Sequence, residues 1–132
     1  MKIYTSYFGN LKNLEKENIF PIGVCCYPPK WFKGPNLASI GPTPDILEKC
    51  KSNHLEYVKR YKNEILSIQG NPQDFIDRVK FISDGKDVAL CCFETPDQFC
   101  HRHLIAEWLN ETLNLDVKEF EKTNEIKVNP LF

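Results

Sequence analysis

The alternation of apolar and polar residues divides the chain into strand-like and helix-like segments. Short, almost uncharged apolar runs predict buried strands at residues 1–8, 21–27 and 87–93. Apolar positions at helical spacing predict helices over residues 43–50, 53–68, 72–83 and 96–113. We expect residues 11–18 to form a loop or a short helix, and residues 117–120 to add an edge strand. Strands that alternate with helices predict one α/β domain over residues 1–132, a small three-layer sandwich with a mostly parallel central sheet flanked by helices.

The start of the last predicted helix carries a capping signal. Thr95 is suited to the N-cap, Pro96 to the first helical position, and Gln98 to the reciprocal position of a capping box. We therefore expect this helix to begin directly after the third strand.

Length and charge narrow the classes of function. The chain has 132 residues and a net charge of −1, from 17 basic and 18 acidic residues. This balance argues against sequence-independent binding to nucleic acid or anionic lipid, which needs an excess of basic residues. No apolar run approaches the roughly 20 residues of a membrane span, and the first residues lack the hydrophobic core of a signal peptide. We expect a cytoplasmic protein without a membrane partner.

The six cysteines do not form the spacing of a metal site or a disulfide framework. Cys25-Cys26 and Cys91-Cys92 are adjacent pairs inside apolar runs, and no C-x-x-C sequence occurs. Buried cysteines of a reducing compartment act mostly as small apolar side chains. The sequence therefore predicts reduced cysteines, no bound metal and no cofactor.

The strand-to-helix junction around residues 91–103 is the best candidate for a site, because ligands of α/β proteins collect where strands end and helices begin. Arg102 falls on the apolar arc of the predicted helix, where an unpaired guanidinium is costly. Two interpretations stay open and are compatible. Arg102 pairs with Glu94 and ties the strand to the helix, or it joins the helix N-terminus in binding an anion such as phosphate.

Other side chains at this junction suit proton transfer or thiol chemistry. Glu94 and His101 are candidate acids and bases, although a histidine on an apolar arc is as often a core residue. Cys100 lies beside His101 and near a helix start, both of which favour a thiolate, and Cys92 lies near the strand end. Either cysteine could be a reactive thiol or a buried apolar residue.

Two further groups are candidates for contacting a ligand. The long loop after the second strand carries Lys30, Trp31 and Lys33, which would wall a pocket by stacking and by binding phosphate, or would pin the loop to the core. Tyr57 and Tyr61, one helical turn apart, would present hydroxyls to a pocket or pack in the core.

These motifs resemble the bacterial and phage family called domain of unknown function 488. The resemblance is carried by the block from Leu90 to Leu109, which contains Cys92, Glu94 and Cys100-His101-Arg102, and by Pro28-Pro29-Lys30-Trp31-Phe32-Lys33-Gly34. It implies a compact α/β domain and the position of a site, but no reaction. Many relatives carry Asp-x-Arg where the second strand ends, whereas this chain has Val24-Cys25-Cys26-Tyr27. If that arginine binds a ligand in the relatives, the resemblance implies either weaker binding in this chain or substitution by Lys30 and Lys33.

Three hypotheses about function follow. The first is an enzyme or ligand-binding domain for a phosphate-bearing small molecule or nucleotide, held by Arg102 and stacked on Trp31. The second is a non-enzymatic adaptor whose loop 28–35 binds a protein or single-stranded nucleic acid. The third is a redox or metal site built from Cys92, Cys100 and His101. The sequence holds no Walker loop, G-x-G-x-x-G or G-x-S-x-G motif.

Overall fold

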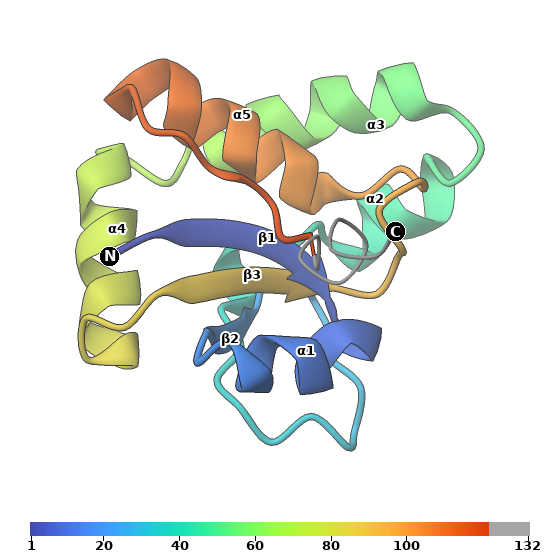
Figure 1. The fold of residues 1–132 in the computed structure, drawn as a ribbon. Coiled ribbons are helices and arrows are strands. Elements are labelled where there is room, and N and C mark those ends of the chain that lie inside the picture. Colours follow the sequence, from blue (N-terminus) through green and yellow to red (C-terminus); the bar gives the residue numbers. More distant parts are fainter. Residues whose placement is uncertain (122–132) are drawn as a thin grey trace, which may run out of the picture.

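The computed structural model describes residues 1–121 and has a four-stranded parallel sheet at its centre (Figure 1). The strands are β1 (Ile3–Tyr7), β2 (Phe20–Gly23), β3 (Val88–Cys92) and β4 (Lys118–Glu119), in the order β2-β3-β1-β4. The helices are α1 (Leu11–Lys16), α2 (Pro44–Lys49), α3 (His54–Tyr61), α4 (Pro72–Ser83) and α5 (His101–Leu113). Two short 3₁₀ turns, Phe8–Asn10 and Ala38–Ile40, and a π-helical segment, Lys62–Leu66, are also present.

The α/β sandwich predicted from the sequence is confirmed. Figure 1 shows α3 and α5 over one face of the sheet and α1 over the other. The larger core lies between the sheet and helices α2 to α5, and a smaller one, which includes Phe8, Leu14 and Cys91, lies under α1. Strand β3 is buried at every position because it is covered on both faces. No helix in residues 1–121 has the length and apolarity needed to cross a membrane.

Local capping signals set most helix starts where the sequence predicted them. The side chains of Thr43, Asn53 and Asn71 each accept a hydrogen bond from a backbone N–H in the first turn of α2, α3 and α4. Proline follows at the first position of α2 and α4, where its missing N–H costs nothing.

The predicted helix over residues 53–68 is interrupted. After Tyr61 the chain continues as a π-helical segment, Lys62–Leu66, which holds more residues per turn than an α-helix. The buried face therefore rotates: Ile65 and Leu66 are buried, while Ile68, which α-helical spacing places on the apolar face, is exposed.

The predicted start of α5 is wrong by five residues. The Thr95 hydroxyl donates to the Asp97 carboxylate at 2.6 Å, and residues 95–98 form only a turn. The helix begins at His101, with Cys100 as an N-cap that makes no side-chain capping bond. The capping-box pattern therefore forms a turn, and residues 93–100 form a loop between β3 and α5.

The outer edge of β2 is covered by the loop that follows this strand. The amide of Asn36 bonds both backbone groups of Cys25, at 3.1 Å to its N–H and 2.8 Å to its carbonyl. The backbone of Gly23 bonds Pro35 and Leu37 on the same side. This loop therefore holds the end of β2, from which Cys25 and Cys26 project.

Arg102 is fully buried and is paired with Glu119 rather than with Glu94. Its Nε and Nη2 donate to the two carboxylate oxygens of Glu119, both at 3.0 Å, in a bidentate pair. Its Nη1 donates to the Glu94 backbone carbonyl at 2.7 Å and to Cys92 Sγ at 3.0 Å. Glu119 also accepts from the Thr5 hydroxyl at 2.7 Å. The expected Glu94–Arg102 ion pair is therefore not formed: the pair that is present links α5 to β4, and the Glu94 side chain is exposed.

We expect Glu119→Ala to destabilise the protein by about 3 kcal/mol, because it leaves a buried guanidinium without its carboxylate. Urea unfolding measures the change, and Glu111→Ala on the exposed side of α5 is the control, expected within about 0.5 kcal/mol of the unchanged chain. Joint replacement by Arg102→Met and Glu119→Leu is expected to cost less than Glu119→Ala alone. A loss below about 1 kcal/mol in Glu119→Ala would contradict the assignment.

Candidate functional site

A cavity of about 260 Å³ lies at the carboxyl ends of β2 and β3, where ligands of parallel α/β sheets bind. The ends of these strands, the 93–100 loop, the start of α5, α2 and α3 all contribute to it. The lining residues are Cys25, Cys26, Tyr27, Pro42, Leu47, Lys51, His54, Tyr57, Cys92, Phe93, Glu94, Phe99, Cys100 and His101.

One side of the cavity is a disulfide between Cys92, the last residue of β3, and Cys100, the N-cap of α5. The prediction of reduced cysteines is therefore wrong for this pair, although Cys25, Cys26, Cys50 and Cys91 are free. Sequence spacing did not reveal the bridge because the loop between the two cysteines, rather than a helix, returns the chain to the strand end.

His101 is a buried, neutral histidine whose ring orientation is fixed. Its Nε2 lies 2.6 Å from the Val24 carbonyl, which can only accept, so Nε2 carries the proton. Nδ1 is then a lone pair, and it lies 3.8 Å from Cys100 Sγ. Burial lowers the pKa of His101 from 6.5 to about 4, against a smaller opposing effect of the Val24 hydrogen bond. The arrangement leaves a lone pair facing sulfur throughout the neutral pH range.

The side of the cavity formed by α3 is aromatic. The His54 and Phe99 rings are stacked with centroids 4.3 Å apart, and Tyr57 meets Phe99 edge-on at 4.8 Å. Burial, followed by the negative charge of Glu94, raises the pKa of Tyr57, so its phenol stays protonated. This wall can receive a flat ring.

Charged groups stand at the exposed rim. Glu94 is the one carboxylate among the described lining residues, and Lys51 supplies an ammonium at the end of α2. Burial and the charge of Glu94 also raise the pKa of Cys25 to about 12, so that thiol remains neutral. The rim therefore offers both a proton acceptor and a cation.

Gly41 permits the backbone approach that closes the cavity behind Pro42. A Cβ atom at this position would lie 2.5 Å from the Cys26 backbone nitrogen and 2.6 Å from the Cys25 carbonyl carbon. Only glycine allows the chain to pass this close to the end of β2 without a shift of backbone.

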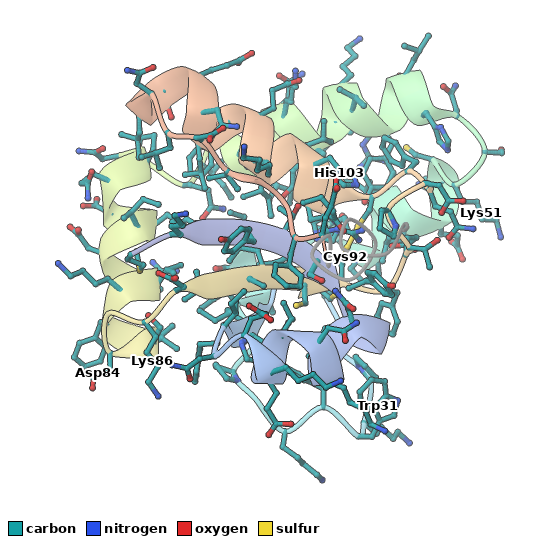
Figure 2. All side chains as sticks on the ribbon, viewed as in Figure 1. Trp31, Lys51, Asp84, Lys86, Cys92 and His103 are labelled. Atoms are coloured by element: carbon teal, nitrogen blue, oxygen red, sulfur yellow. A yellow bond between two sulfur atoms is a disulfide. The ribbon has the colours of Figure 1, made fainter. Side chains whose placement is uncertain are left out.

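The structure brings together five of the predicted site residues: Cys92, Glu94, Cys100, His101 and Tyr57. The others do not line the cavity. Tyr61 is a core residue whose hydroxyl donates to the Ile40 carbonyl, and Arg102 is occupied by the contacts described above. Lys30, Trp31 and Lys33 are not among the lining residues, and Figure 2 shows Trp31 below α1.

Sequence reasoning missed Lys51, His54 and Phe99 as lining residues. His54 lies three positions before Tyr57 on the same predicted helix face, and that spacing was the available signal. Phe99 was missed because the sequence predicted a helix over residues 96–113, whereas Phe99 lies in the loop before α5. Lys51 lies between two helices, and no pattern marks it.

The family model of the active DUF488-N3 subclade matches residues 4–113 of this chain. No curated protein and no solved structure matches the chain. The matched range contains all the residues that line the cavity.

Acid should destabilise the protein through His101. The unfolded histidine binds a proton below about pH 6.5, whereas the folded one does so only near pH 4, so stability falls as the pH drops through this window. We expect a loss of about 2 kcal/mol between about pH 7.5 and pH 5, measured by urea unfolding. His101→Gln should remove most of this loss, and His54→Gln, at an exposed position, should retain it. An unchanged pH dependence in His101→Gln would contradict the buried neutral histidine.

Gly41→Ala should cost about 1–3 kcal/mol, because the new methyl group meets fixed backbone at the end of β2. Thermal unfolding measures the loss, with Ser52→Ala at an exposed position as the control. A Gly41→Ala protein as stable as the control would show that the approach is not tight.

Proposed function

We propose, given that this chain belongs to the DUF488 family, that its cavity binds and acts on a small phosphate-bearing molecule with a planar ring, of the nucleotide class. The observation that carries the proposal is the cavity itself, which combines an aromatic wall with a cation and a carboxylate at its rim. Its volume, about 260 Å³, suits a compact ligand rather than a polymer.

Each part of such a ligand has a matching group. A planar ring fits the wall formed by Phe99 and Tyr57, because aromatic faces stack on flat rings. Lys51 supports phosphate binding as a point charge, and the His54 ring adds a polar contact beside it. Glu94 would accept a proton from a hydroxyl or ring N–H of the ligand, which makes it the proposed general base.

Arg102 has another role in this proposal. Four of its contacts are already made within the protein, so it positions the strand end and helix start instead of receiving the anion. The anion site first expected at the Glu94–Arg102 junction is therefore proposed at the Lys51 rim of the same cavity.

The exposed aromatic loop supports a second candidate, an adaptor role. Trp31 is 59% exposed and Tyr27 70%, and Lys30 and Lys33 are exposed beside them. Exposed aromatic rings flanked by lysines suit stacking with single-stranded nucleic acid. The first proposal is favoured because the reactive side chains line one cavity, whereas Trp31 does not contribute to its lining.

A thermal-shift series with nucleoside monophosphates, ribose 5-phosphate and inorganic phosphate tests the proposal. We expect the largest stabilisation with a nucleoside monophosphate, reaching about 2–3 kcal/mol at a hundredfold excess over Kd. Lys51→Ala should weaken binding about tenfold, since it removes a charged contact to phosphate. Lys59→Ala, an exposed lysine of α3 outside the cavity, and Trp31→Ala should bind as the unchanged protein does.

Two results would overturn the proposal. One is the absence of any shift with millimolar concentrations of all three probe classes. The other is equal weakening by Lys51→Ala and Lys59→Ala, which would indicate non-specific attraction. Loss of binding in Trp31→Ala alone would move the ligand site to the loop and favour the adaptor.

A further inference from the structure

The cysteine pair beside the cavity has surroundings that a purely structural bridge does not need. Cys92 and Cys100 both line the cavity, so a small molecule bound there reaches the bridge although each residue is at most 3% exposed. The bond closes a loop of residues 93–99, three of which, Phe93, Glu94 and Phe99, form part of the cavity lining.

The two sulfur atoms differ in what surrounds them. Arg102 Nη1 donates to Cys92 Sγ at 3.0 Å, and arginine keeps its charge at every physiological pH. A thiolate released at Cys92 would therefore form beside a fixed guanidinium, which makes Cys92 the better leaving group. Cys100 Sγ has the His101 Nδ1 lone pair at 3.8 Å instead.

The other charged and titratable groups near the bridge are consistent with Cys92 as the leaving group. Arg102 is shared with Glu119 of β4, and its remaining Nη1 is the donor that faces Cys92. Cys91, which precedes Cys92 in β3, and Cys25, just after β2, have pKa values raised to about 12 by burial and stay neutral. Neither of these thiols competes as a nucleophile at neutral pH.

We propose that Cys92 and Cys100 are a redox-active pair that exchanges its disulfide with a dithiol entering the cavity. The thiolate of the dithiol attacks Cys100 Sγ, a mixed disulfide forms, and the Cys92–Cys100 bond breaks with its electron pair leaving on Cys92. Arg102 holds the resulting Cys92 thiolate.

A second exchange completes the reaction. The other sulfur of the dithiol attacks its partner in the mixed disulfide and closes a disulfide in the external molecule. Cys100 leaves and takes up the proton of that second thiol next to His101 Nδ1, while the proton of the first thiol goes to water. Two electrons pass from the dithiol to the protein, and the reverse steps reduce an external disulfide and re-form the Cys92–Cys100 bridge. This activity does not depend on the nucleotide-type ligand proposed above.

The rate of reduction by dithiothreitol distinguishes a redox-active bridge from a structural one. Oxidised full-length protein is reduced in the native state and, separately, in urea, and the Cys92–Cys100 peptide is followed by alkylation and mass spectrometry. An inert buried bridge reacts more slowly in the folded chain than in the unfolded one. We expect the native bridge to react about tenfold faster than the unfolded one, because Arg102 stabilises the leaving thiolate.

Variants assign the roles of the residues. Arg102→Lys and His101→Gln should lower the native rate while leaving the rate in urea unchanged, and Arg78→Lys, at an exposed position on α4, should alter neither. If Arg102→Lys does not fold, His101→Gln carries the test. In an equilibrated buffer of reduced and oxidised glutathione, Cys92→Ser should hold a mixed disulfide on Cys100, whereas Cys100→Ser should hold far less on Cys92, because Arg102 favours the free Cys92 thiolate.

Three results would overturn the proposal. The bridge is structural if the native rate is below the rate in urea. The bridge does not form if both cysteines are still alkylated after the protein is equilibrated with excess oxidised glutathione. The site is a metal site if the reduced protein takes up one equivalent of zinc that blocks reoxidation, since Cys92, Cys100 and His101 place their donor atoms within 4.8 Å of one another.

Discussion

The bidentate pair between Arg102 and Glu119 holds the carboxyl end of the sheet together. A buried guanidinium cannot lose its charge, so the chain must bring a carboxylate to it, and that carboxylate belongs to a two-residue strand. Its contacts to Glu119, the Glu94 carbonyl and Cys92 then fix β4, the 93–100 loop and the end of β3 around the first turn of α5. The cavity lies beside this arrangement, and its geometry depends on it.

Charge and burial divide the junction into two regions. On the inner side, Arg102 and Glu119 satisfy each other and leave one donor for sulfur. On the outer side, Glu94 and Lys51 are exposed and remain available to a ligand. The sequence placed Glu94 and Arg102 in one site, whereas the structure turns the Glu94 backbone inward and its side chain outward. Proximity in the chain therefore did not establish an ion pair.

Local signals predicted the elements, and long-range contacts account for the errors. Pro72 and the turn at Asp84-Gly85 bound α4 where the sequence placed it, because both act within a few residues. The capping signal at Thr95 predicted the wrong start for α5, because the Thr95 hydroxyl bonds the Asp97 carboxylate and does not cap the helix. Glu119 could not be identified as the partner of Arg102, because the pair requires β4 to dock beside β1. The Cys92–Cys100 bridge could not be predicted, because the sequence pattern indicated a helix from residue 96 where the chain forms a loop.

The amide of Asn36 has a consequence for how the molecule behaves at high concentration. An uncovered outer strand presents a row of unpaired N–H and carbonyl groups on which another chain can add. Asn36, Pro35 and Leu37 engage those groups at Gly23 and Cys25, so this margin of the sheet cannot template edge-to-edge aggregation along that stretch. At the opposite margin, β4 extends over only two residues, which gives an incoming strand little to pair with.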